Sequence, residues 1–217
     1  MSLAEVESPE EIGGGCGPSI QRVGGKWQSW PASRLSHHGR SCCDVAREWI
    51  MAMDHSLLAG AAPASGPRWL RERYPWGPSP WPLHWCEAVE SKRLDCGAHA
   101  AMALEIFQAR GVESYPVQLV QHFSPEATLH WAGQWRDKGL QPAWIDGEVI
   151  YHEGCAVVVG DDEIKLWDAS AGAWIDPRQA GGYGSLLSFR VLAPQNLSLR
   201  WGGQRVPMGS WTTPSGR

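Results

Sequence analysis

A cysteine, a histidine and an aspartate occur in an order that could support nucleophilic catalysis. The cysteine, Cys96, stands at the front of the alanine-rich stretch "LDCGAHAAMALEIFQARG", directly after Asp95. Asp95 can cap a helix, because its carboxylate can accept hydrogen bonds from the free N–H groups of the first turn. The start of a helix also favours a thiolate, which is the nucleophilic form of cysteine. These residues predict a reactive cysteine at the N-terminus of a helix.

A cysteine nucleophile also needs a base, and the base needs a partner that orients it. His152 lies at the start of the strand-like run "YHEGCAVVVG", and Asp168 lies at the end of the second run "EIKLWDA". Asp161 and Asp162 between the runs predict a turn, so the two runs are expected to form an antiparallel hairpin. Counted outward from the turn, His152 falls opposite Asp168, within a residue or two. Asp168 could then fix the imidazole tautomer and leave the other ring nitrogen for the thiol.

The same residues allow two other interpretations. Cys96 could be a small core residue of an apolar helix, without a chemical role. Cys96 with His99, and His152 with Cys155, also form two pairs of the kind that bind zinc. Residues three apart in a strand face opposite sides, however, which argues against a shared site for His152 and Cys155. We therefore expect no metal and no other cofactor, with Cys155 in the core.

The surrounding chain divides into an arm, a domain and a tail. Residues 1–40 are rich in Gly, Ser and Pro and predict a flexible N-terminal arm. Residues 41–200 are expected to form a single domain that begins with a helix between Cys42 and Gly60. A proline-rich segment then predicts a long loop, with one short helical turn at Trp69–Arg73, that could cover a site. Residues 201–217 are expected to be a surface tail.

The order of these elements predicts an α+β fold. The helix that starts near Cys96 is expected to end at Gly111, a residue type suited to helix ends. A strand in "SYPVQLVQHF", a helix in "SPEATLHWAGQWRDKG", the hairpin and a strand in "SLLSFRVLA" follow. A helix followed mainly by strands is typical of α+β proteins. We expect this helix to pack on an antiparallel sheet that carries His152 and Asp168.

In combination, these segments resemble the transglutaminase-like superfamily, a branch of the papain-like cysteine enzymes. The stretch "DCGAHAAMALEIFQARGVESYPVQLV" is similar to the family's cysteine helix and the strand after it. "YHEGCAVVV" is similar to its histidine strand, and "IKLWDASAGAWIDP" to the strand that ends in Trp-Asp. The resemblance covers residues 86–176. It implies a papain/transglutaminase-like fold, with Cys96 as nucleophile, His152 as base and acid, and Asp168 as the orienting residue.

The sequence departs from the family pattern in two places. Gly97 follows the cysteine where the family usually has an aromatic residue. Glu153 and Gly154 follow the histidine where a small and then an aromatic residue are usual. For a developing oxyanion, the backbone N–H of Cys96 is one expected donor. Family analogy suggests Trp85, or another residue of the proline-rich loop, as a candidate for the second donor.

Three further residues are expected to lie near a substrate: Trp85, His99 and Trp167. The chain has 14 tryptophans in 217 residues, and many of them stand beside proline or glycine. Tryptophan suits pocket walls as well as cores, because it joins a large apolar ring to one N–H donor. His99, one turn after Cys96, could be structural or could line the pocket.

The resemblance implies acyl transfer through a Cys96 thioester. Water as the second nucleophile would make the protein an amidase or protease, and an amine would make it an amide-forming enzyme. The expected partners are an acyl donor, which could be a peptide, a protein or a carrier-bound thioester, and an amine acceptor. The alternatives are a non-catalytic binding or scaffold module that keeps the fold, and a zinc-stabilised module.

Charge and hydropathy argue against several other classes. The net charge is −4, the pI is near 6.1 and no long run of Lys or Arg occurs, so we expect no nucleic-acid partner. No stretch approaches the roughly 20 apolar residues of a membrane-spanning helix. The acidic start "MSLAEVESPEEIGGG" lacks the apolar core of a signal peptide. We therefore expect a cytoplasmic protein, in which the six cysteines stay reduced.

Overall fold

The computed structural model describes residues 19–23, 26–30, 35–36, 48–49, 68–78, 83–142, 144–175 and 184–214. The named helices are α3 (Trp69–Arg73), α4 (Trp85–Glu90), α5 (Cys96–Ala109) and α6 (Pro125–Arg136). The strands up to the hairpin are β1 (Ser19–Val23), β2 (Lys26–Trp30), β3 (Leu35–Ser36), β4 (Leu83–His84), β5 (Ser114–His122), β6 (Ile145–Asp146) and β7 (Val149–Gly160). The later strands are β8 (Glu163–Asp168), β9 (Ala173–Trp174), β10 (Ser185–Val191), β11 (Leu199–Trp201) and β12 (Gln204–Val206).

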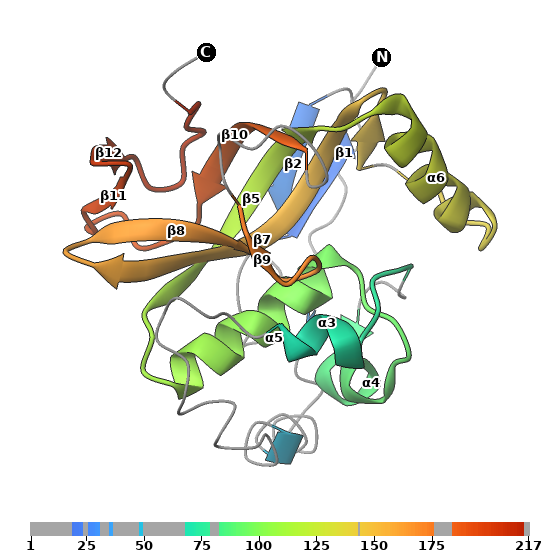
Figure 1. Ribbon diagram of the computed structural model, residues 1–217, viewed down its shortest axis with the longest axis horizontal. Coiled ribbons are helices and arrows are strands. Elements are labelled where there is room, and N and C mark those ends of the chain that lie inside the picture. The colour runs from blue at the N-terminus through green and yellow to red at the C-terminus, as the bar shows by residue number, and fades with distance from the viewer. Residues whose placement is uncertain are drawn as a thin grey trace, which may run out of the picture.

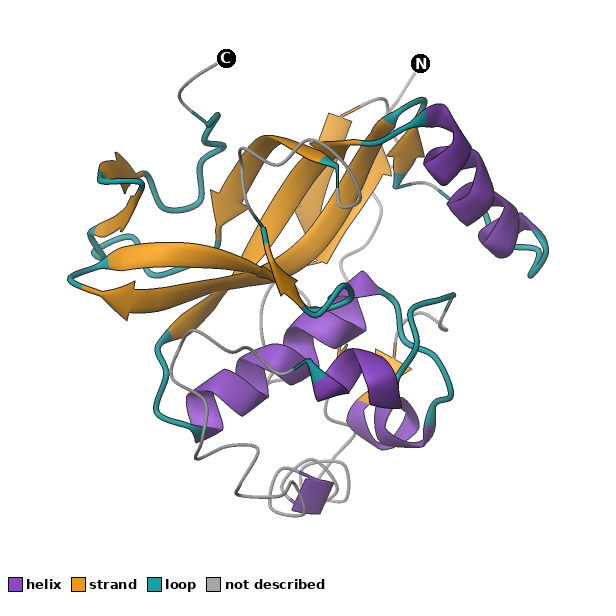
Figure 2. Ribbon diagram, in the orientation of Figure 1, coloured by secondary structure: helices purple, strands orange, loops and turns teal. Residues whose placement is uncertain are grey.

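The described part of the chain is a mixed α and β fold in which helices cover one side of a curved sheet. Figures 1 and 2 show α3, α4 and α5 grouped together beside the sheet, while α6 lies apart at its other end. The main sheet has eight strands in the order β10-β5-β7-β8-β11-β12, with β6 on β7 and β9 on β8. Its pairs are antiparallel except for one parallel contact between β8 and β11. The predicted α+β class is consistent with this arrangement.

The β7–β8 hairpin forms as the sequence predicts. Asp161 and Asp162 make the turn with φ angles of 41° and 63°. Left-handed backbone at both central positions is typical of a type I′ turn, whose twist suits antiparallel strands, and Asp tolerates it well. Because Cys155 pairs with Trp167, the next residue on β8, Asp168, is level with Gly154. His152 therefore lies two residues further along β7, on the same face of the sheet as Asp168.

Helix α5 begins and ends at the residues that its sequence predicts. The Asp95 carboxylate caps the first turn by accepting a hydrogen bond of 3.0 Å from the backbone N–H of Ala98. Cys96 is the first residue of the helix. At the other end, Gly111 has a φ of 69°, a left-handed conformation that suits the residue after a helix.

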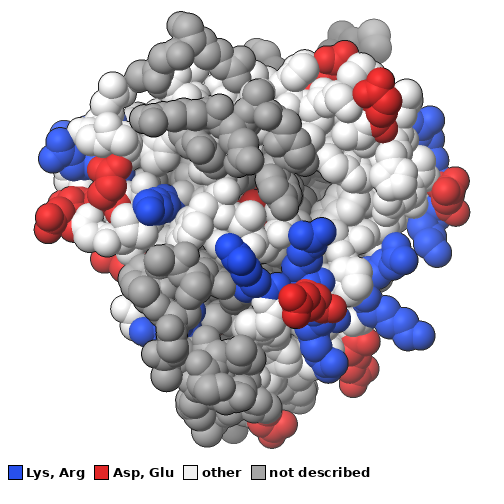
Figure 3. All heavy atoms as spheres, in the orientation of Figure 1, with Lys and Arg blue, Asp and Glu red and all other residues white. Residues whose placement is uncertain are grey.

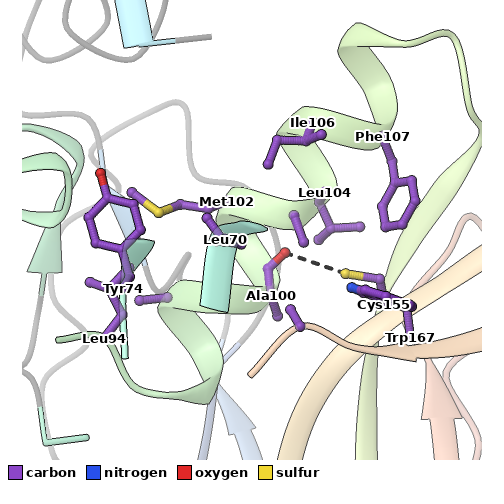
Figure 4. Close-up of a cluster of buried hydrophobic side chains, with 14 of the residues drawn as sticks. Leu70, Tyr74, Leu94, Ala100, Met102, Leu104, Ile106, Phe107, Cys155 and Trp167 are labelled. Atoms are coloured by element: carbon purple, nitrogen blue, oxygen red, sulfur yellow. Dashed lines mark hydrogen bonds between the residues drawn. The ribbon is translucent and has the colours of Figure 1, made fainter. Parts of the chain in front are cut away.

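Small residues let α5 lie close to the sheet. Figure 4 shows this part of the core, with the Cys155 thiol of β7 directed at the carbonyl oxygen of Ala100, 3.5 Å away. The ring of Phe107 meets the ring of Trp167 edge to face, with the centroids 6.5 Å apart. A second apolar cluster contains Leu119, Leu166 and Phe189 from three strands of the sheet. Because α5 is packed on β7, the position of its first residue is fixed relative to the hairpin.

The end of the chain differs from the predicted surface tail. β12 pairs with β11, and Thr212 exchanges backbone hydrogen bonds with Phe189 on β10 at 2.7 and 2.9 Å. Val206 and Met208 are buried in the second apolar cluster. The prediction of a tail after residue 200 is therefore wrong for residues 204–212. Short strands separated by Gly and Pro carry too little periodicity to be recognised in isolation.

The N-terminal arm and the first helix are covered only in part. Within the predicted arm, β1 pairs with β2, and β3 pairs with β4 from outside the arm, so the backbone there includes strands rather than loop alone. Of the predicted helix between Cys42 and Gly60, residues 48–49 are helical, and the rest lie outside the described residues. Among the described residues, no helix is both long enough and apolar enough to cross a membrane.

Candidate active site

The structure brings His152 and Asp168 together across the hairpin. The Nε2 atom of His152 lies 3.0 Å from Oδ1 of Asp168. This distance is that of an ion pair, but the ring N–H is not aligned for a straight hydrogen bond. Both side chains are largely buried, with 13% of His152 and 9% of Asp168 exposed. Because Nε2 faces the carboxylate, Nδ1 is the ring nitrogen left for another partner.

His152 and Asp168 each stabilise the charged form of the other. Burial on its own lowers the pKa of His152, but the facing Asp168 carboxylate and the nearby Cys96 side chain raise that pKa well above its ordinary value. Burial on its own raises the pKa of Asp168, but His152 and the backbone N–H groups of Ala171 and Ser170 lower it. The arrangement therefore favours an imidazolium beside a carboxylate.

Cys96 completes the group from the start of α5. Its side chain is partly exposed and forms no disulfide, and it is close enough to His152 to interact with the imidazole by hydrogen bonding and by charge. As the first residue of the helix, Cys96 also belongs to a turn whose N–H groups have no partner within the helix. The structure thus gathers a thiol, an imidazole and a carboxylate that are 72 residues apart in sequence, from Cys96 to Asp168.

The segment that contains α3 is hydrogen-bonded to the backbone just before Cys96. The backbone of Leu94 bonds to this segment in both directions, donating to the carbonyl of Pro75 at 3.2 Å and accepting from Gly77 at 3.0 Å. Trp76 forms a bridge with Leu94 between these bonds. Since Leu94 is two residues before Cys96, the Trp76 backbone is tied directly to the start of α5.

The same segment supports the turn after Asp168. In this turn Oδ1 of Asp168 also accepts a hydrogen bond of 3.0 Å from the backbone N–H of Ala171. Arg71 on α3 donates to the carbonyl of Ala171 at 3.0 Å. Gly172, with a φ of 66°, lies against the backbone of Arg68. The region from Arg68 to Gly77 therefore contacts both the backbone just before Cys96 and the turn after Asp168.

His99 is a buried structural residue and does not line the cavity described below. Its side chain is fully buried, with Nδ1 2.9 Å from the carbonyl oxygen of Asp95 and Nε2 2.6 Å from that of Tyr74. Burial lowers the pKa of His99, and the two carbonyls partly oppose this effect. The ring therefore joins the start of α5 to the end of α3. This role follows from tertiary contacts that the spacing from Cys96 did not reveal.

The two tryptophans predicted near the substrate are also in the core. Trp85 is 1% exposed, and its ring packs against that of Trp49 with centroids 5.5 Å apart. Trp167 is fully buried against Phe107 and Trp174. The side chains of Trp85, His99 and Trp167 do not contribute to the cavity that adjoins the His152–Asp168 pair.

That cavity is walled by a different set of aromatic residues. It has a volume of about 420 Å³, and its wall includes His152, Asp168, Trp76, Phe123, Trp131 and Trp144. Trp131 belongs to α6, while Phe123 and Trp144 lie in the segments that flank it. Sequence reasoning missed these residues, although the tryptophan content gave a general signal. Figure 3 shows basic and acidic side chains mixed over α3, which carries Arg71, Glu72 and Arg73 beside the site.

Gly154, the second residue after His152, is required by the close packing of the two hairpin strands. A Cβ atom on Gly154 would lie 2.6 Å from the carbonyl oxygen of Trp167. Only glycine therefore allows β8 to come this close to β7, directly before Asp168. Gly154 therefore lies at the close approach of the two strands, directly beside the residues that place Asp168 near His152.

The residues weighed as zinc ligands have other contacts or face apart. Cys155 faces Ala100 on α5, on the opposite side of β7 from His152, and burial raises the pKa of its thiol far above the ordinary range. His99 is engaged by two backbone carbonyls. In the part of the chain that the structure describes, no group of three or more His, Cys, Asp or Glu side chains is arranged to hold a metal ion.

Fold and site together define a mixed α and β protein with a helix-start cysteine facing a histidine–aspartate pair on a hairpin. No family model matches the chain, and no curated protein or solved structure is significantly similar to it.

Proposed function

We propose that this protein is a transglutaminase-like cysteine enzyme that transfers an acyl group through a thioester on Cys96. The observation that carries the proposal is the contact of 3.0 Å between His152 and Asp168, with Cys96 within reach of the same imidazole. The papain-like identity of the fold is part of this proposal. It is supported by a cysteine helix packed on an antiparallel hairpin that carries the other two residues.

The chemistry would proceed in two steps. With its proton already held by His152, the Cys96 sulfur attacks as a thiolate the carbonyl carbon of an amide, ester or thioester and forms a tetrahedral intermediate. The imidazolium then protonates the leaving group as the carbon–heteroatom bond breaks, which leaves an acyl thioester. In the second step His152 takes a proton from water or an amine as that nucleophile attacks, and the thioester bond breaks to release the Cys96 sulfur.

Asp168 and the helix start would assist both steps. Asp168 holds the imidazole through Nε2 and stabilises its positive charge, so Nδ1 can exchange the proton with the thiol and the substrate. The backbone N–H of Cys96 would donate to the oxyanion of the tetrahedral intermediate, because Cys96 is the first residue of α5 and its N–H has no acceptor within the helix.

Selective alkylation tests this proposal without a known substrate. After brief exposure of the native protein to iodoacetamide near neutral pH, peptide mapping by mass spectrometry should show Cys96 as the most rapidly modified cysteine. Cys86 is the matched internal control, because it is also a partly exposed thiol without a disulfide, but it lies in the first turn of α4 and is not among the groups that shift the pKa of His152. His152→Ala should slow the alkylation of Cys96 and leave that of Cys86 unchanged.

The scaffold alternative makes the opposite prediction. If the fold is a non-catalytic binding module, Cys96 and Cys86 should react at similar slow rates, and His152→Ala should change neither. That outcome would rule out an activated nucleophile. Zinc analysis of the purified protein tests the metal-stabilised alternative in the same preparation.

A further inference from the structure

We propose that the aromatic cavity binds the component of the reaction whose N–H or O–H proton passes through His152, and that this component carries an aromatic or bulky apolar body. This inference rests on the proposed function and adds to it a substrate class and the side of the scissile bond on which that class binds.

The wall of the cavity is suited to a flat apolar group. Trp131 packs on Phe123 and Trp76, with ring centroids 4.8 and 5.9 Å apart, and Trp144 meets Trp76 at 5.9 Å. These four side chains are all only partly buried and line one cavity of about 420 Å³. That volume is within the range of small-molecule sites, which are mostly apolar with a few polar groups. Aromatic rings placed edge to face favour an aromatic occupant.

The charges of the cavity argue against a cation as the body of the occupant. Among the described residues, Asp168 is the one carboxylate of the wall, and it already faces His152. Arg71 at the rim adds a positive charge that is bonded to the carbonyl of Ala171. Two polar groups of the wall, the indole N–H of Trp144 and the hydroxyl of Ser170, are buried without a hydrogen-bond partner within the described residues. An apolar body next to a polar amide group would suit both kinds of surface.

The position of the cavity decides which component it takes. His152 and Asp168 are part of the wall, but Cys96 is not. The acyl group must bond to the sulfur, whereas the leaving group and the incoming nucleophile must contact the imidazole that exchanges their proton. A cavity that borders the imidazole but not Cys96 therefore binds the amine or alcohol component.

Two isomeric amides test this assignment. N-(2-phenylethyl)acetamide carries its ring on the amine side, and N-ethyl-2-phenylacetamide carries it on the acyl side. With Cys96→Ala, which cannot form the thioester, tryptophan fluorescence titration should show binding of the first isomer and much weaker binding of both the second isomer and N-ethylacetamide, which has no ring. Trp131→Ala in this background should weaken binding about tenfold, which corresponds to the loss of one aromatic contact.

Leu129→Ala is the control, because Leu129 lies on the same helix and is 65% exposed. Its affinity for the first isomer should equal that of the parent. Circular dichroism checks that each variant folds, and Trp131→Leu replaces Trp131→Ala if the latter does not. Equal binding of amides with and without a ring, or no effect of either substitution at Trp131, would overturn the cavity assignment even if Cys96 proves catalytic.

Turnover by the wild-type protein tests the side of the bond. S-Ethyl thioacetate supplies the acyl group and releases ethanethiol, and 2-phenylethylamine or ethylamine accepts the acyl group. We expect kcat/KM for 2-phenylethylamine to exceed that for ethylamine at least tenfold, and Trp131→Ala to remove most of the difference. Acyl transfer without preference between the amines would contradict this inference. Absence of acyl transfer together with intact binding of the aromatic amide would instead contradict the proposed function.

Discussion

At the scale of single residues, the Oδ1 atom of Asp168 has two partners. It faces His152 at 3.0 Å and also accepts from the backbone N–H of Ala171 at 3.0 Å. Asp168→Asn can keep the bond to Ala171, so the turn should remain folded. The negative charge beside the imidazole is lost, however, and the amide can select the wrong tautomer.

We therefore expect Asp168→Asn to lower turnover of a thioester substrate while leaving measurable activity. The loss should be smaller than the about 10⁴-fold loss of the comparable change in serine proteases, because a thiolate needs less help from its base. Steady-state kcat/KM measures this loss, and Asp137→Asn at the exposed end of α6 is the control. Unchanged activity in Asp168→Asn would remove Asp168 from the mechanism.

The raised pKa of His152 makes part of the folding stability dependent on pH. Burial opposes the charged imidazole, but Asp168 and Cys96 raise the pKa well above its unfolded value. The native state then binds more protons than the unfolded state, and the stability due to His152 falls as the pH rises through the folded pKa. This contribution should be fully present below the unfolded pKa of about 6.5.

The comparison of wild type with His152→Gln measures this effect. The difference in melting temperature should be larger near pH 6 than near pH 9, because the imidazolium–carboxylate attraction is lost at the higher pH. Thermal melts by circular dichroism at both pH values provide the numbers. A difference that stays constant, or that grows toward pH 9, would mean that His152 is neutral in the native protein.

At the scale of elements, the cap of α5 stabilises the first turn, which begins with Cys96, the proposed nucleophile. Asp95→Ala removes the bond to the N–H of Ala98 and should cost about 1 kcal/mol of stability. Ser124→Ala on α6 removes a similar cap, since Ser124 accepts from Ala127 at 3.3 Å. Denaturant unfolding should show both losses, but only Asp95→Ala should slow the alkylation of Cys96. Equal alkylation rates in the two variants would show that the Asp95 cap does not affect the reactivity of Cys96.

The close approach of β8 to β7 is a second test at this scale. Gly154→Ala places a methyl group 2.6 Å from the carbonyl oxygen of Trp167, so the backbone before Asp168 must shift. We expect a loss of about 1–3 kcal/mol in the free energy of unfolding, as in other overpacked sites, together with reduced turnover.

Gly133→Ala on α6 is the matched control, because its Cβ would meet nothing within 4 Å. In a helix this change should be neutral or stabilising by roughly 0.5–1 kcal/mol. Urea unfolding curves and kcat/KM for both variants are required. Wild-type turnover in Gly154→Ala would show that the distance between the strands does not govern the placement of Asp168.

At the scale of the whole molecule, local patterns predicted the elements that carry the candidate site. The cap at Asp95, the turn at Asp161 and Asp162 and the alternation of the hairpin strands are all short-range signals, and the structure contains each of these elements. The meeting of His152 and Asp168 followed from them, although the register places them two residues apart rather than opposite.

The walls of the site were not predictable in the same way. Trp76, Phe123, Trp131 and Trp144 come from separate segments, and only tertiary packing brings their rings together. Trp85 and Trp167 have the same residue type but are in the core. Composition indicates that tryptophans matter, but it does not distinguish a pocket wall from a buried ring, because both use the same apolar surface.

The most direct test of the central claim is the identity of the residue that becomes acylated. The protein is incubated with S-ethyl thioacetate and quenched at short times in acid, and its peptides are mapped by mass spectrometry. We predict one acetyl group on Cys96 in the wild type, none in Cys96→Ala, and slower acetylation of Cys96 in His152→Ala. The account would be contradicted if Cys86 in Cys96→Ala became acetylated as fast as Cys96 does in the wild type. Equal acetylation of both cysteines in the native protein would contradict it as well.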